Sequence, residues 1–170
     1  MADQETIYLE EEAENESEHK YLLFKLGDEE YGINITMVQS IEEMQTIIAV
    51  PDMPDYVKGV INLRGQVIPV LDLRINFNME EREYDDRTCM VITRISETNM
   101  GLIVDTVSEV VDIPAGSIEP PPQFKSDSRR EHYIAGSGKV EDEVKILLDV
   151  SKLLRGEEVE EILASAPEAK

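Results

Sequence analysis

Side chains that commonly carry out chemistry are few in this chain, and their spacing does not suit catalysis. His19 lies in an acidic stretch and His132 in a segment predicted to form a short helix, so neither belongs to a zinc-ligand pattern or a catalytic triad. The single cysteine, Cys89, has no CxxC partner and no histidine near it in the sequence, which favours a structural thiol. The sequence therefore predicts no catalytic residue and no cofactor.

Two acidic clusters are the candidates for metal chemistry. They are Asp85 with Asp86 and the run Glu141, Asp142 and Glu143. Carboxylates suit divalent cations, but neither cluster has the ligand alternation of a calcium-binding loop. A metal-assisted enzyme built on these clusters stays open as an alternative from a different class, and no metal site is predicted.

The turn around position 64 does not by itself require an arginine there. The stretch "GVINLRGQVIPVLDLR" (residues 59–74) predicts two apolar strands joined at "NLRG". An arginine offers a fork of donors that suits a carboxylate or a carbonyl oxygen on a partner. At this point two explanations of Arg64 stay open, contact with a partner and drift.

Composition narrows the class of protein. The 170 residues carry a net charge of −21, which argues against nucleic acid and against anionic membrane surfaces as partners. The single cysteine excludes an internal disulfide and fits a reducing compartment. No stretch approaches the roughly 20 apolar residues that span a bilayer, so a cytoplasmic protein without direct membrane insertion is expected.

The charge is concentrated at the two ends of the chain. Residues 1–19 hold eight acidic side chains and no lysine or arginine, and they are predicted to form a disordered acidic tail. A solubilising role is the simpler interpretation of this tail, and a partner-binding role stays open. Residues 155–170 are predicted to form an amphipathic helix and a short tail.

The middle of the chain alternates short apolar runs with turn residues, which predicts a mainly β structure. Short helical turns are expected at 51–59 and 128–136. Pro69 cannot donate to a ladder, so its strand is expected to be an edge strand or bulged.

An internal repeat organises these strands. Sliding the chain by 69 residues lays 21–44 over 90–113, and a shift of 77 residues continues the match from Gly59 onto Gly136. The two copies, about 21–74 and 90–152, each predict about five short strands, which suggests a small barrel. The prediction leaves open that the chain crosses from one barrel to the other at the ends of the copies.

Features that recur in both copies are interpreted as architecture. They are the pairs Gly32/Gly101, Pro51/Pro120, Gly59/Gly136 and Asp72/Asp149. Arg64 does not recur, because Glu141 takes its place in the second copy. The fold therefore does not require Arg64, which leaves partner contact and drift as its explanations.

Several segments resemble the CheW family, the coupling proteins of bacterial chemotaxis. They are "FKLGDEEYGINI", "VPDMPDYVKGVINLRGQVIPVLDLR", "GLIVDTVSEVVDI" and "YIAGSGKVEDEVKILLDVSKLL", and the resemblance covers roughly residues 20–155. It implies a CheW-like domain at 20–154, made of two SH3-like five-stranded β-barrels packed side by side, with short helices and a C-terminal amphipathic helix.

The resemblance also implies a function and partners. Such proteins are non-catalytic scaffolds that link the cytoplasmic tip of methyl-accepting chemoreceptors to the regulatory domain of the histidine kinase CheA, in arrays at the inner side of the membrane. A CheW-like adaptor of another receptor–kinase pathway stays open as a related alternative.

In the family, the receptor tip lies in a groove between the two barrels. Carried onto the matching positions of this chain, the groove would involve Val38, Ile41, Gly59, Arg64, Val107 and Val110. An amphipathic helix docks by its apolar stripe, so β-branched side chains suit such a groove. The alternative is that the valines belong to the barrel cores. The kinase contact is implied at an end of the first barrel, with no residues named.

Overall fold

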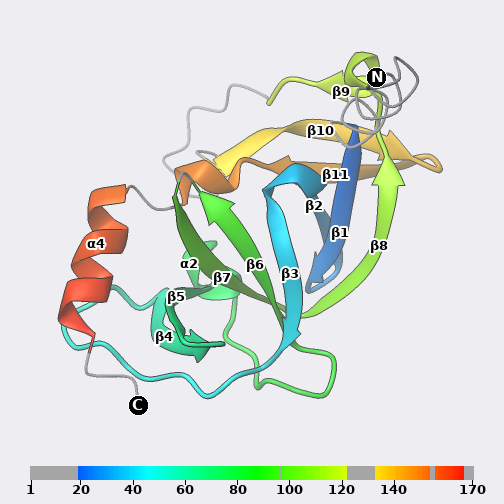
Figure 1. The fold of residues 1–170 in the computed structure, drawn as a ribbon. Coiled ribbons are helices and arrows are strands. Elements are labelled where there is room, and N and C mark those ends of the chain that lie inside the picture. Colours follow the sequence, from blue (N-terminus) through cyan, green and yellow to red (C-terminus); the bar gives the residue numbers. More distant parts are fainter. Residues whose placement is uncertain (1–18, 96, 122–132, 154–155, 167–170) are drawn as a thin grey trace, which may run out of the picture.

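The structure is a computed structural model that describes residues 19–95, 97–121, 133–153 and 156–166. Within these ranges the chain is mainly β, as predicted, and its strands form two sheets (Figure 1). The predicted acidic tail lies outside the described residues except for His19, and His132 also lies outside them.

The elements follow the repeat closely. In chain order they are β1 (Lys20–Leu26), β2 (Glu29–Asn34), η1 (Ile35–Met37), β3 (Val38–Glu43), β4 (Val57–Leu63), β5 (Gln66–Asp72), α2 (Leu73–Asn76), β6 (Cys89–Ile95), β7 (Thr98–Val104), β8 (Thr106–Asp112), η2 (Ala115–Ser117), β9 (Ile118–Glu119), β10 (Ile134–Val140), β11 (Glu143–Leu148), η3 (Val150–Lys152) and α4 (Gly156–Ser165).

Each barrel takes strands from both repeats. Barrel A has the strand order β8-β1-β2-β11-β10-β9, and barrel B has the order β3-β6-β7-β5-β4. The first hairpin of each repeat, β1–β2 or β6–β7, therefore stands among the later strands of the other repeat. The chain crosses from barrel A to barrel B between β2 and β3, and it crosses back between β7 and β8 (Figure 1).

The exchanged hairpins join the later strands through parallel pairs. Strand β2 runs parallel to β11 with Gly32 opposite Leu147, and β7 runs parallel to β5 with Gly101 opposite Val70. A Cβ on Gly32 would lie only 2.8 Å from Cδ2 of Leu147, so the glycine permits this pairing. The equivalence of the two glycines, predicted from the repeat, is confirmed.

The two repeated aspartates also have matching structural roles. Asp72 caps α2 by accepting from the amide groups of Arg74 and Ile75, and Asp149 caps η3 by accepting from the amide of Ser151. An aspartate in this position satisfies amide groups that have no partner within the helix. Both positions are architecture, as predicted.

One large hydrophobic core is common to the two barrels. It unites buried side chains of barrel A, such as Leu22 and Phe24, with buried side chains of barrel B, such as Val60 and Val91. Four aromatic rings form a chain within it, with centroid separations of 5.7–6.0 Å, and they belong to Phe24, Tyr31, Phe77 and Tyr133. The shared core explains why the barrels pack side by side, as predicted.

Helix α4 closes part of this shared core. Its side chains Val159 and Ile162 are buried there, and the helix contacts β5. Figure 1 shows α4 at the side of the molecule away from β8. The amphipathic pattern in the sequence predicted this helix correctly.

Two local predictions were wrong. Strand β4 begins at Val57 within the helical turn predicted at 51–59. The helix predicted at 128–136 lies outside the described residues up to residue 132; Tyr133 is helical, and β10 begins at Ile134. Pro69 lies in β5, which is flanked by β4 and β7, and it is tolerated because the pairing with β7 begins one residue later at Val70. In β4 and β5 strand pairing outweighs the local preference for a helix or an edge.

The repeat also holds an insertion earlier than expected. Ile48 bridges Val60 in barrel B, and Glu119 pairs with Ser137 at the equivalent position of barrel A. Ile48 therefore corresponds to Glu119, which places extra residues before β9, where η2 lies. The ungapped match of Pro51 with Pro120 was therefore wrong.

Candidate functional site

Strand β3 presents Val38 and Ile41 on the same face because it contains a β-bulge. Val38 lies opposite Thr93, Ser40 opposite Ile92 and Ile41 opposite Val91, so the register shifts between Val38 and Ser40. Directly opposed residues of an antiparallel pair point to the same side of the sheet. Val38 and Ile41 therefore share the side of Val91, which belongs to the shared core.

Strand β8 repeats this arrangement in barrel A. Its register also shifts, so that Val107 lies opposite Phe24 and Val110 lies opposite Leu22. Phe24 and Leu22 both belong to the shared core. Both edge strands therefore turn a pair of apolar side chains toward the side on which the barrels meet.

The four side chains differ in burial. Val38 and Val107 pack against the shared core and are partly buried. Ile41 and Val110 are 47% and 49% exposed, which is high for large hydrophobic side chains. We name Val38, Ile41, Val107 and Val110 the inter-barrel surface. Each barrel contributes one partly buried and one exposed apolar side chain to it.

Gly59 lies apart from this surface and has a structural role. A Cβ on Gly59 would lie 2.0 Å from the carbonyl oxygen of Ile48, and the residue has a φ of +145°. At the equivalent Gly136, a Cβ would lie 2.5 Å from the carbonyl oxygen of Glu119. Both glycines sit where β4 or β10 is bulged and a neighbouring backbone approaches closely.

Arg64 lies at the tip of the β4–β5 hairpin. Its side chain is 74% exposed, and one terminal nitrogen of its guanidinium lies 3.1 Å from Oε1 of Glu42 on β3. Glu42 follows Ile41 directly, so Arg64 is tied to the strand that forms one half of the inter-barrel surface. An exposed ion pair of this kind contributes only about 0–1 kcal/mol to stability.

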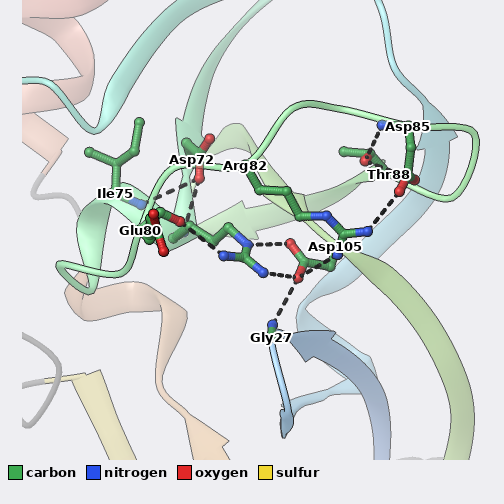
Figure 2. Close-up of polar contacts among 9 residues, drawn as sticks. Gly27, Asp72, Ile75, Glu80, Arg82, Asp85, Thr88 and Asp105 are labelled. Atoms are coloured by element: carbon green, nitrogen blue, oxygen red, sulfur yellow. Dashed lines mark hydrogen bonds and ion pairs between the residues drawn. The ribbon is translucent and has the colours of Figure 1, made fainter.

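A partly buried ion pair joins the two barrels at the crossing between β7 and β8. Arg74 donates from Nε to Oδ1 of Asp105 at 2.6 Å and from a terminal nitrogen to Oδ2 at 2.5 Å. The backbone amide of Gly27 in the β1–β2 turn donates to Oδ2 of Asp105 at 2.8 Å, and Arg82 approaches the same oxygen at 3.4 Å (Figure 2). We name Arg74, Asp105 and Gly27 the Asp105 clasp.

The contacts within the clasp shift the pKa values of Asp105 and Arg74. Burial alone would raise the pKa of the Asp105 carboxyl group, but hydrogen bonds from Arg74 and from the Gly27 amide outweigh burial and lower that pKa below the ordinary value of 3.8. The hydrogen bond to Asp105 raises the pKa of Arg74. Both groups are therefore charged at neutral pH.

One member of each acidic cluster is engaged within the protein. Asp85 accepts hydrogen bonds from the amide groups of Arg87 and Thr88, and the Arg87 amide is the main cause of its lowered pKa. Glu143 pairs with Lys145 at 2.8 Å. In the described part of the chain, no group of three His, Cys, Asp or Glu side chains is placed to hold a metal ion.

Cys89 begins β6, half-buried. Burial raises the pKa of its thiol above 9.0. The thiol is therefore protonated at neutral pH, which makes it a poor nucleophile.

Lys145 is a buried cation that the sequence did not single out. It is 6% exposed, and its Nζ lies 2.8 Å from Glu143 and 3.4 Å from Glu30. The repeat places Ile68, which is 1% exposed, at the equivalent position of barrel B. The repeat could have predicted that Lys145 is buried, because the equivalent residue of the first copy, Ile68, is apolar.

Comparison with known proteins decides the family. The model of the CheW-like domain matches residues 20–158. The chain belongs to the CheW family. The chemotaxis protein CheW of Klebsiella aerogenes is 38% identical over 140 residues, which are 82% of this chain and 84% of that protein. The chemotaxis protein CheW of Bacillus subtilis is 39% identical over 111 residues, which are 65% of this chain and 71% of that protein.

A solved CheW structure has the same fold. The crystal structure of the scaffolding protein TtCheW from Thermoanaerobacter tengcongensis matches with a TM-score of 0.74 and 34% identity, covering 79% of this chain and 91% of that one. The predicted CheW resemblance and the predicted pair of SH3-like barrels are thus confirmed. The predicted strand number of five holds for barrel B, whereas the sheet of barrel A has six strands because the two-residue strand β9 pairs with β10. None of the helices within the described ranges is long and apolar enough to cross a membrane.

The CheW fold brings some of the predicted site residues together and separates others. Val38, Ile41, Val107 and Val110 face the side on which the barrels meet, and Arg64 reaches β3 through Glu42. Gly59 instead allows the backbone at Ile48 to approach closely within barrel B. Sequence reasoning missed the Asp105 clasp, because Arg74 and Asp105 are 31 residues apart and meet only through the parallel pairing of β5 and β7.

Proposed function

We propose that this CheW-family chain is a non-catalytic scaffold that couples the cytoplasmic tip of chemoreceptors to the histidine kinase CheA. The observation that supports it best is the inter-barrel surface, on which two edge strands from different barrels expose Ile41 and Val110. A receptor tip is a helical hairpin, and an amphipathic helix docks by an apolar stripe. Two exposed apolar side chains, flanked by partly buried valines, suit such a stripe.

Arg64 has a role at one border of this surface in the proposal. Its exposed guanidinium can donate to a carboxylate or carbonyl oxygen of the partner, while Glu42 holds it near β3. CheA would contact an end of barrel B, which holds β3, β4 and β5 of the first repeat. The protein would act in the cytoplasm, within receptor arrays on the inner side of the membrane.

Co-sedimentation with CheA and a receptor signalling fragment tests this function, with kinase activity as the readout. Substitutions Ile41→Glu and Val110→Glu place a charge within the proposed contact and should reduce recovery of the protein with the receptor fragment. Val144→Glu is the matched control, because Val144 is 59% exposed and lies on β11, outside the inter-barrel surface.

The outcomes separate the proposal from its alternatives. Loss of receptor binding in both surface variants, with normal binding of Val144→Glu, supports the proposed contact. A wild-type protein that binds neither CheA nor the receptor fragment contradicts the coupling function. Binding only to a receptor and kinase of another pathway would favour the related adaptor role.

A further inference from the structure

The two crossings between the barrels are built differently. At the crossing from barrel B to barrel A, β7 ends at Val104 and β8 begins at Thr106, so Asp105 is the single residue between them. At the other crossing, β2 ends at Asn34 and η1 leads into β3. Strands β3 and β8, which carry the inter-barrel surface, follow these crossings directly.

Asp105 is bonded to both barrels at once. Arg74, which follows β5 of barrel B, donates to both of its carboxylate oxygens. On the side of barrel A, the Gly27 amide donates to Oδ2 of Asp105, and the Asp105 amide donates to the carbonyl oxygen of Lys25 at 3.1 Å. The side chains of Arg74 and Asp105 are only 14% and 10% exposed, so water screens their attraction weakly.

The repeat provides a control for this ion pair. Asp72 lies opposite Ile103 in the parallel pair β5–β7. Arg74 lies two residues after Asp72, and Asp105 lies two residues after Ile103. Ser151 and Thr36 hold the equivalent positions at the other crossing, and neither is charged. Their hydroxyl groups bond locally, to Asp149 and Asn34 respectively.

The fold therefore builds the same crossing once with an ion pair and once without it. A guanidinium that bonds both oxygens of a carboxylate fixes orientation as well as distance. Buried ion pairs often add little net stability compared with apolar side chains of similar size. The ion pair here bonds the residue directly before β8 to barrel B.

We propose that the Asp105 clasp is a positioning device that sets the separation between β3 and β8, and with it the shape of the inter-barrel surface. This inference rests on the proposed function for its biological meaning. Val107 lies two residues after Asp105, so a shift of the crossing moves the barrel A side of the surface. Arg74 and Asp105 act through β8, without touching the partner.

A distance measurement between the two strands tests the clasp directly. In a Cys89→Ala background, nitroxide labels on Ile41→Cys and Val110→Cys report the separation of β3 and β8 by double electron–electron resonance. We expect one narrow distance distribution for the intact clasp. Arg74→Lys keeps the charge but loses the fork, and Arg74→Met with Asp105→Asn removes both charges together. Both changes should broaden or shift the distribution while the circular dichroism spectrum stays folded.

Two matched variants serve as controls. Ser151→Ala alters the equivalent position at the other crossing. Lys58→Met removes the ion pair between Lys58 and Glu81, which lies outside the clasp. Both should leave the distribution unchanged. Unlabelled Arg74→Lys should also be recovered in smaller amounts with the receptor fragment.

The outcomes are decisive for the clasp. A distribution that stays superimposable on the wild type in folded Arg74→Lys overturns the proposal, and so does equal broadening in the two controls. If the double variant does not fold, Arg74→Lys decides alone. A wild-type chain that fails to bind the receptor fragment contradicts the proposed function, yet leaves the distance result and the positioning role of the clasp intact.

Discussion

Arg64 occupies a backbone conformation that most side chains avoid. It has a φ of +51° and is followed by Gly65 at +85°, so the two-residue turn between β4 and β5 has both central residues in the left-handed region. Asn-Gly is the favoured pair for such a hairpin turn, and a left-handed residue other than glycine or asparagine costs roughly 1–2 kcal/mol. Glu141 and Asp142 make the matching turn of barrel A with φ values of +50° and +66°.

The two turns allow stability and coupling to be separated. We expect Arg64→Asn to leave the free energy of unfolding unchanged or raised by up to about 1 kcal/mol, because relief of the backbone offsets loss of the exposed ion pair with Glu42. The same variant should weaken receptor coupling. Glu141→Asn should raise stability by about 1 kcal/mol and leave coupling unchanged. Urea unfolding and co-sedimentation measure the two effects, and normal coupling by Arg64→Asn would remove Arg64 from the contact.

The lowered pKa of Asp105 leads us to expect that the stability of the protein depends on pH. Its pKa in the folded protein is lowered, so the folded state binds the proton less readily than the unfolded chain does. The stabilising contribution is complete above the ordinary value of 3.8 and is lost as the pH falls below it through the folded pKa. Asp85 and Glu143 also have lowered pKa values, so the comparison must be made between variants.

We therefore expect the stability difference between the wild type and Asp105→Asn to be largest at neutral pH and to shrink on acidification below about pH 4. Urea unfolding at a series of pH values measures this difference. A difference that stays constant down to pH 2 would show that the charge of Asp105 does not contribute to stability.

At the level of elements, bulged strands determine where side chains and backbones meet. The bulges in β3 and β8 turn residues three apart toward the same side of each sheet, which creates the inter-barrel surface. The bulges in β4 and β10 bring Gly59 and Gly136 against a neighbouring carbonyl group. Both pairs of bulges occupy equivalent positions in the repeats, so they belong to the architecture.

Gly59→Ala should disturb the fold of barrel B. Because the new methyl group would overlap the carbonyl oxygen of Ile48, we expect a loss of about 3 kcal/mol or more in the free energy of unfolding. Gly136→Ala should behave alike in barrel A. Gly116→Ala is the control, since nothing lies within 4 Å of its Cβ position, and it should change stability by less than about 0.5 kcal/mol. Thermal melting followed by circular dichroism gives the comparison, and a harmless Gly59→Ala would mean that Ile48 can move away.

The strands and their repeat could be predicted because apolar runs and paired glycines are visible along the chain. The exchange of hairpins could not be assigned, since β1–β2 and β6–β7 match each other and either hairpin would satisfy the same pattern in either barrel. The residues of the inter-barrel surface were named from family resemblance. Simple strand alternation would place Val38 and Ile41 on opposite faces, and only the bulge brings them to the same face. The meeting of Arg74 with Asp105 depends on strand register, which local sequence does not contain.

The whole molecule is held together by strand exchange and by the shared core. Barrel A contains β1 and β2 of the first repeat beside β8–β11 of the second, and barrel B contains β6 and β7 of the second beside β3–β5 of the first. The shared core collects buried side chains from both barrels. Neither repeat therefore forms a complete barrel from its own strands, and the inter-barrel surface needs both.

Cutting the chain between the repeats tests this interdependence. A fragment of residues 1–77 contains β1–β5 but lacks β6 and β7, which separate β3 from β5 in barrel B. It would also expose core side chains such as Leu22 and Phe24, so we expect it to be unfolded or self-associated when alone. The fragment 78–170 should behave in the same way. Mixing the two should restore the circular dichroism spectrum of the intact chain in a one-to-one complex, measured by sedimentation. A folded monomer of 1–77 would show that β1–β2 can replace β6–β7, and that a single repeat is enough to close a barrel.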